Sequence, residues 1–263
     1  MRVPVRKHGK PTGFTLVEMA IVLVIIGIIL AGVMKGRDIV RSSQVKQFAQ
    51  SYAQKWVTIA QTYYDKSGQH LTDGVINGGS AASSDGRMDG IIVGPQGTGG
   101  LAAGVQTSVM LALKTIGIDP CTIVKTDMEN LTQASMGAAG GCEGDMNPFS
   151  RSVDGEITGK VAVGVGFKAF TITQNTLASV RNTVYLVDVP LDVAMALDTI
   201  LDGSARGDQG SVIYTGSVAA NQNGVVAAWR NGNSAATAIT ATAWPSYTTS
   251  NVQYVDPVLV LDN

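Results

Sequence analysis

Apolar residues run almost without interruption from Phe14 to Met34. As an α-helix rising 1.5 Å per residue, this stretch would be about 31 Å long, close to the ~30 Å hydrocarbon thickness of a bilayer. The pattern therefore predicts a membrane-spanning helix over 14–34. Glu18 departs from the pattern, because it places a carboxylate where a charge raises the cost of insertion.

A one-sided pattern follows the apolar stretch. Large apolar residues recur at steps of three or four, with Ser, Gln, Lys and Arg between them, at Val45, Phe48, Tyr52, Trp56, Ile59 and Tyr63. This spacing places them on one face of a helix that packs against a core. Lys66 followed by Ser67 and Gly68 predicts the end of the helix. A single helix over 14–67 is far longer than the average of about 11–12 residues.

The rest of the chain, 68–263, has the pattern of a mixed globular head. Residues 72–105 are rich in Gly, Ser and Asp and predict loops with one short strand at 91–93. Helical periodicity marks 107–118 and 189–203. Strands are expected at 160–173, 183–189, 210–215, 224–229 and 252–262. The sequence therefore predicts an α+β fold, with an antiparallel sheet of the head packed on the long helix.

The charges are arranged unevenly along the chain. The formal net charge of −1 gives no indication of a nucleic acid as a general partner. Residues 1–13, however, contain Arg2, Arg6, Lys7 and Lys10 and no acid, which favours a cytoplasmic N-terminus. A secretory signal would have a shorter apolar core followed by a small-residue cleavage site. A plain signal anchor explains the length but not Glu18, and the third interpretation is cleavage before the apolar stretch, after Gly13.

A basic leader that ends in Gly13, followed by the sequence FTLVE and an apolar stretch, resembles the N-terminus of type IV prepilins and of type II secretion pseudopilins. The resemblance covers about the first 55 residues. It implies that 1–13 is a leader peptide, removed after Gly13 by a prepilin peptidase that also N-methylates Phe14. It also implies that the helix remains on the mature protein and that 68–263 is an extracytoplasmic head.

The resemblance implies a structural subunit of a type IV pilus-like filament that polymerises through its hydrophobic helix. Glu18 could pair with the new amine at Phe14 of its own chain, and in a filament it would instead pair with that of a neighbouring subunit. The expected partners are copies of the chain or related pilins, an inner-membrane assembly platform and, before assembly, membrane lipid. The expected location is the inner membrane, with a periplasmic head, and then an extracellular pilus or a periplasmic pseudopilus. The alternatives are a type II secretion pseudopilin and a minor pilin with an adhesive or DNA-binding role.

In many pili of this family the helix loses its structure on assembly, between a glycine and a proline. Gly27 matches that glycine, but Lys35 stands at the position of the proline.

Cys121 and Cys142 are the two cysteines of the chain. A head outside the cytoplasm and an even number of cysteines predict a disulfide between them, and two buried free thiols are the alternative.

The sequence offers few groups for catalysis, and we expect no enzyme. Without the leader, His70 is the one remaining histidine, expected in a solvated loop, whereas a catalytic triad or a zinc site needs clustered partners. One acidic group, Asp198, Asp202 and Asp208, could begin a calcium site, although the pattern is not that of an EF-hand. The alternative is a solvated helix end closed by Gly203, and no other cofactor is expected.

Overall fold

The structure is a computed structural model that describes residues 14–81, 84–93, 103–124, 148–155, 159–216, 238–246 and 254–261. The chain divides into two compact units, Met1–Ser43 and Gln44–Asn263. The expected leader 1–13 and the expected strand 224–229 lie outside the described residues.

The long helix is confirmed. It consists of α1 (Leu16–Phe48), one π-helical turn η1 (Ala49–Ala53) and α2 (Gln54–Ser67). Gly68 ends it in the left-handed conformation (φ 71°), where its amide N–H bonds to the carbonyl of Tyr64 over 2.8 Å. A glycine adopts this backbone without a Cβ penalty, so the predicted stop at Lys66–Gly68 is confirmed.

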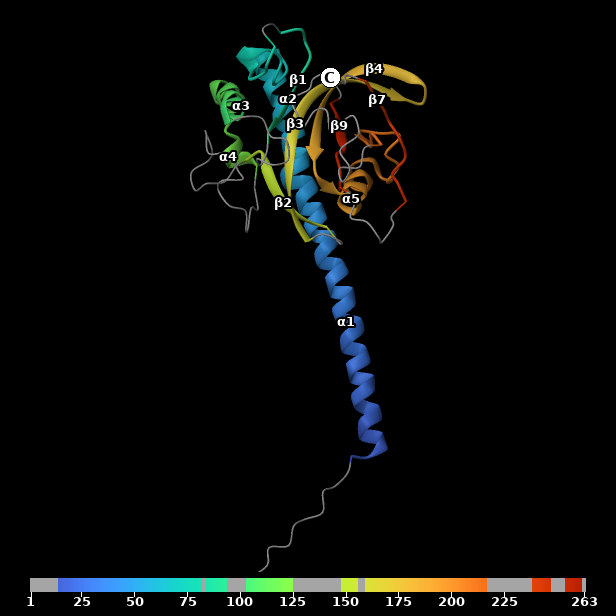
Figure 1. The fold of residues 1–263 in the computed structure, drawn as a ribbon. Helices are drawn as coiled ribbons and strands as arrows, with labels where there is room; N and C mark the ends of the chain where they lie inside the picture. The colour runs from blue at the N-terminus through green and yellow to red at the C-terminus, as the bar shows by residue number, and fades with distance from the viewer. Residues whose placement is uncertain are drawn as a thin grey trace, which may run out of the picture. The chain divides into compact units, whose positions relative to one another are not determined.

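The described part of the head contains a seven-stranded sheet. It is built around one long strand, β3 (Gly159–Gln174), which is labelled in Figure 1. A tight turn at Asn175 and Thr176, both with positive φ, leads into β4 (Leu177–Val187), which pairs with β3 along its length. Two central residues with positive φ are the signature of a type I′ hairpin. The other edge of β3 holds β2 (Ser150–Gly155), β1 (Asp89–Val93) and β7 (Ala238–Thr240).

Two further strands extend the sheet beyond β4. These are β9 (Val258–Val260), which pairs with β4, and β6 (Val212–Ile213), which pairs with β9. All pairings in this sheet are antiparallel except that of β7 with β3. A separate antiparallel pair joins β5 (Val189–Pro190) to β8 (Tyr254–Val255). The remaining elements are η2 (Val75–Asn77), α3 (Ala103–Thr115), α4 (Pro120–Ile123) and α5 (Leu191–Asp202).

The helix packs on one face of the sheet within Gln44–Asn263. All six residues of the predicted apolar face, from Val45 to Tyr63, are buried. The ring of Trp56 stacks on Phe149 at 4.8 Å and meets Phe167 edge-on at 5.7 Å. The hydroxyl of Tyr52 donates to the carbonyls of Phe149 and Val163, so the buried polar atom has partners. The predicted α+β fold is therefore confirmed.

The opposite face of the sheet carries a smaller core. Alternate residues of β3 and β4 point to opposite faces. Phe170, Ile172 and Tyr185 therefore lie away from the helix, where they pack with Ile213, Ile239 and Val258. Because both faces are covered, the central strands are buried on both sides.

Several predicted boundaries were wrong. The strand expected at 183–189 begins already at Leu177 and is interrupted at Asp188, whose φ is 62°. The strand expected at 210–215 is reduced to Val212–Ile213, and the one expected at 252–262 is divided at Asp256 and Pro257 into β8 and β9. The strand expected at 91–93 begins at Asp89.

The predicted helices are present with shifted ends, at Ala103–Thr115 and Leu191–Asp202. The strands β2 and β7 and the helix α4 were not predicted.

Candidate functional site at the N-terminus

The first turn of α1 contains a reciprocal set of hydrogen bonds between Thr15 and Glu18. The Glu18 Oε2 atom accepts the amide N–H of Thr15 over 2.9 Å and the Thr15 hydroxyl over 3.0 Å. In return, the amide N–H of Glu18 donates to Oγ1 of Thr15 over 3.3 Å. This is a capping box, in which two side chains satisfy amides that the first helical turn leaves without partners. The Glu18 carboxylate, although it stands in an apolar stretch, therefore caps the start of the helix.

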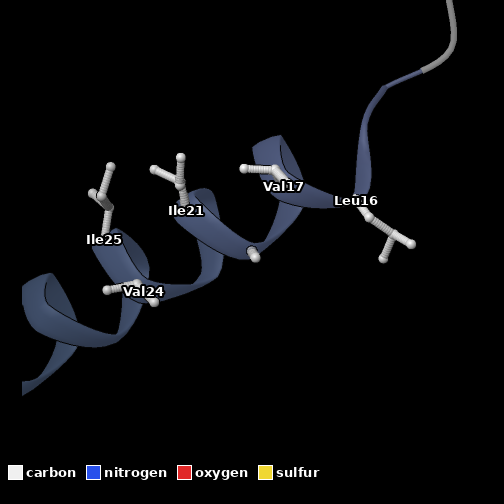
Figure 2. A pocket seen from close by; sticks show the side chains of 6 residues that line it. Leu16, Val17, Ile21, Val24 and Ile25 are labelled. Atoms are coloured by element: carbon white, nitrogen blue, oxygen red, sulfur yellow. The ribbon is translucent and has the colours of Figure 1, made fainter.

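Large apolar side chains cover the helix after this cap and are exposed all round it. Phe14 is 79% exposed and Leu16 is 90% exposed, and the exposure continues through Val40. Leu16, Val17, Ala20, Ile21, Val24 and Ile25 line a shallow apolar groove on the surface of the helix. Figure 2 shows that Val17, Ile21 and Ile25 point to the same side. A soluble monomer rarely exposes so continuous an apolar surface, which therefore needs lipid or other helices around it.

Within the described residues, one helix, Leu16–Ser67, is long and apolar enough to cross a membrane by its length and composition. Three glycines lie in it at Gly27, Gly32 and Gly36, each with open space where a Cβ would stand. The helix is continuous through all three in this single chain.

The three carboxylates proposed for a calcium site at the end of α5 each have a hydrogen-bond or ion-pair partner within the protein. Asp198 is fully buried, and its Oδ2 accepts the amides of Arg206 (2.9 Å) and Gly207 (3.0 Å) and the indole N–H of Trp244 (2.6 Å). Among the described residues, no group of three or more His, Cys, Asp or Glu could hold a metal ion.

The other two carboxylates of this group have partners of their own. Asp202 accepts the amides of Ser211 (2.9 Å) and Val212 (2.8 Å) and the Ser211 hydroxyl. Asp208 forms an ion pair with Arg206 at 3.6 Å. The expected glycine stop is present, because Gly203 ends α5 with φ 80°. The expected solvation of this helix end was wrong for Asp198, whose carboxylate instead joins α5 to the loop at 206–207 and to Trp244.

Two other expectations concern the head. Cys121 is disulfide-bonded, and there is no free cysteine among the described residues. Cys142 lies outside those residues, so the predicted Cys121–Cys142 pairing stays a prediction.

His70 is not in a solvated loop: it is 9% exposed and stacks on Tyr64 at 4.5 Å. Burial lowers the pKa of its imidazole, an effect that Asp73 partly opposes.

The role of Thr15 was missed at the level of sequence. The pattern of a Ser or Thr followed three residues later by an acid, just before an apolar stretch, is the signature of a capping box. Thr15 and Glu18 match this pattern, so the sequence contained the signal.

A comparison with known proteins identifies the same N-terminal segment. Residues 10–34 match the family description "Prokaryotic N-terminal methylation motif". No curated protein and no solved structure matches the chain. The matched segment includes Gly13, Phe14, Thr15 and Glu18.

The chain therefore carries the N-terminal methylation motif typical of type IV pilins and pseudopilins. Proteins with this motif are typically structural and not enzymes. Together, the motif and the apolar helix indicate a membrane-anchored prepilin.

Proposed function

We propose that the protein is a structural subunit of a type IV pilus-like filament that assembles through its N-terminal helix. The observation that carries this proposal is the methylation motif at the start of a helix whose apolar side chains are exposed on every side. In the membrane, lipid would cover these side chains. In a filament, the helices of neighbouring subunits would cover them in its core.

A prepilin peptidase would cut after Gly13 and methylate the new amine at Phe14. Glu18 would then receive that amine from a neighbouring subunit. Both hydrogen bonds that the Glu18 carboxylate accepts go to Oε2. Oε1 can therefore meet a protonated amine while Oε2 keeps the helix capped. An ion pair in an apolar layer is costly to break, at about 3–5 kcal/mol when one partner is left unpaired. The pair would thus fix the position of each incoming subunit along the filament.

The subunit would begin in the inner membrane, with its head in the periplasm, and would reach the filament through an inner-membrane assembly platform. Related pilins could share the filament with it. In that oxidising compartment Cys121 would be joined to Cys142. The motif is common to pilins and pseudopilins, so the proposal covers an extracellular pilus, including a minor pilin with an adhesive or DNA-binding role, and the periplasmic filament of type II secretion.

The first experiment tests processing. The full chain is produced in a bacterium with and without a prepilin peptidase, and the N-terminus of the membrane-bound protein is determined by mass spectrometry. With the peptidase, we expect the mature chain to begin at N-methylated Phe14. An intact Met1 in both strains, or a cut beyond Met34, would contradict the proposal. A Gly13→Arg variant is the control, since a large side chain at the cleavage position should leave the leader in place.

A further inference from the structure

One part of the sheet in the head has an open edge. On its inner side β4 pairs with β3 from Leu177 to Val187. On its outer side β9 pairs with it only from Thr183 to Tyr185, and Leu261 adds a bond to the carbonyl of Asn182 over 3.0 Å. From Leu177 to Arg181, the residues that the structure describes supply no partner on the outer side.

The ladder determines which backbone groups face outward. Asn182 and Leu186 both bond on the outer side, Asn182 to Leu261 and Leu186 to Pro257. The backbone N–H and C=O groups of successive residues point to opposite edges of a strand. Those of Ala178 and Val180 therefore point outward, as those of Asn182 and Leu186 do. This stretch is open to solvent, since Leu177 is 77% and Val180 is 46% exposed.

Apart from the charge of Arg181, the usual protection of an edge strand is absent from this stretch. Native edges are commonly blocked by proline, by charged side chains, most often lysine, or by a bulge. The register of β3 with β4 continues without a shift from Gly164↔Val187 to Gln174↔Leu177, so the described hairpin has no bulge. Leu177–Arg181 contains neither proline nor lysine. This part of β4 is therefore a regular template for one more strand.

Arg181 indicates what kind of strand the edge would accept. Its Nε donates to the Ser179 hydroxyl over 3.2 Å, and no described carboxylate forms an ion pair with it. Arg181 lines a small recess of about 130 Å³ together with Ser179, Ser211 and Val260. Val260 is the last residue of β9, so the recess lies where β9 ends beside β4. A guanidinium with free N–H groups binds a carboxylate through two parallel hydrogen bonds.

We propose that an extended segment of a partner protein adds to the outer edge of β4 at Leu177–Arg181, and that an acidic side chain of this segment pairs with Arg181. Backbone bonds to Ala178 and Val180 would supply affinity, and the charge would select the partner, as in other cases of strand addition. The proposal concerns the head alone and does not depend on filament assembly.

The test uses the full chain in detergent micelles and two synthetic peptides. The acidic probe is a short capped peptide of alternating threonine and valine with one central glutamate. The neutral probe has glutamine in place of the glutamate. Binding is measured by fluorescence anisotropy, and protection of the Ala178 and Val180 amides by hydrogen exchange. We expect the acidic probe to bind about tenfold more tightly than the neutral one, a difference of about 1.4 kcal/mol, and to slow exchange at both amides.

Two variants separate the two parts of the proposal. Val180→Pro removes an outward N–H without loss of a bond to β3, a position at which edge strands tolerate proline. Arg181→Gln removes the charge. Each should weaken binding of the acidic probe about tenfold. Lys114→Gln, which removes an exposed cation from α3, is the matched control and should bind as the parent does. Thermal melting checks that each variant is folded. If Val180→Pro does not fold, the proposal is judged from the Arg181→Gln variant and from amide exchange in the parent protein.

Several results would overturn the proposal. These are failure of both probes to bind, equal binding of both probes, or parental affinity in the Val180→Pro or Arg181→Gln variant. Association of the chain with itself that Val180→Pro abolishes would identify a second copy as the occupant, and would also overturn it.

Discussion

Trp244 donates its indole N–H to Oδ2 of Asp198 over 2.6 Å, across a separation of 46 positions in the sequence. The same oxygen accepts the amides of Arg206 and Gly207, whereas Oδ1 is buried without a hydrogen-bond partner. One carboxylate thus joins the end of α5, the loop that follows it and the segment after β7. We expect this part of the head to depend on Asp198 for its stability.

Replacement of Asp198 by alanine should lower the free energy of unfolding by about 2–4 kcal/mol, because it leaves three donors without their acceptor, one of them the buried amide of Gly207. Asp198→Asn keeps one oxygen for the donors and should cost less. Urea unfolding followed by tryptophan fluorescence measures both. Asp208→Ala is the control, since it removes only a partly exposed ion pair, and should change stability by less than about 1 kcal/mol. A loss from Asp198→Ala no larger than that of the control would contradict the prediction.

The same carboxyl should make stability depend on pH. Burial raises the pKa of Asp198 above its ordinary value, and this effect outweighs the opposing hydrogen bonds from Trp244, Gly207 and Arg206. A carboxyl whose pKa is higher in the folded than in the unfolded state binds its proton more tightly when folded. Its contribution to stability is therefore complete below the unfolded pKa of about 3.9 and is lost as pH rises through the folded value.

Asp198→Asn cannot titrate, so the stability difference between this variant and the parent should change across that pH range, in favour of the variant at higher pH. A difference that is constant with pH would mean that Asp198 has the same pKa in both states. Urea unfolding over a series of buffers from acid to neutral provides the measurement.

Substitution can separate the helix-capping role of Glu18 from the assembly role that we propose for it. Gln at this position can still accept the Thr15 bonds of the capping box but has no charge, whereas Ala loses both. We expect Glu18→Ala and Glu18→Gln to insert and to be cleaved after Gly13, and both to lose nearly all filament yield. Thr15→Ala weakens the cap by about 1 kcal/mol and should reduce the yield far less. Filament in the sheared fraction, relative to total membrane-bound protein, is the quantity to measure. Parental yield from Glu18→Gln would show that the charge does not dock the subunits.

Gly166 lies directly beneath the ring of Tyr185, its partner in the register of β3 and β4. A Cβ at this position would collide with Cζ and Oη of that ring, which is fully buried. Gly166→Ala should therefore lower the free energy of unfolding by about 1–3 kcal/mol, as overpacked cores do. The double variant with Tyr185→Leu should lose less stability than the sum of the two single losses, because the smaller side chain leaves room for the added methyl group. Additive losses in urea unfolding would exclude the collision as the cause.

The disulfide can be tested directly. Mass mapping without reduction should find Cys121 joined to Cys142 in protein taken from the periplasmic side. Cys121→Ser should lower the stability of the head by about 2–4 kcal/mol, since the open chain has more conformations when unfolded. Alkylation of both thiols in unreduced protein would contradict the pairing.

The long helix and the N-terminal site could be predicted because both depend on local sequence. The apolar face from Val45 to Tyr63 keeps a helical period through the π-helical turn at Ala49–Ala53, so the helix is evident from sequence although the turn is not. Phe14 and Glu18 belong to a short motif that can be recognised without the rest of the chain.

Features of the head that depend on distant residues were the ones missed. The sequence of β2, SRSVDG, has little strand character of its own, and it becomes a strand because Ser150–Gly155 pairs with β3. Asp198 at a helix end next to Gly203 looks solvated until Trp244 covers it. His70 is buried because the chain turns back after Gly68 and places its ring on Tyr64. In each case a tertiary contact overrides what the neighbouring residues indicate.

The central position of β3 also sets the order in which the head can be completed. Its pairing with β4 needs only a two-residue turn, but its other neighbours come from 89–93, 150–155 and 238–240, and β9 at 258–260 completes the outer side of β4. Pairings between distant segments require large loops to close first, and they slow folding. Because the chain is made from its N-terminus, the β3–β4 hairpin is complete before β9 is. The outer side of β4 therefore lacks β9 until Val260 has been added. The head therefore reaches its final structure only after its last strands have been made.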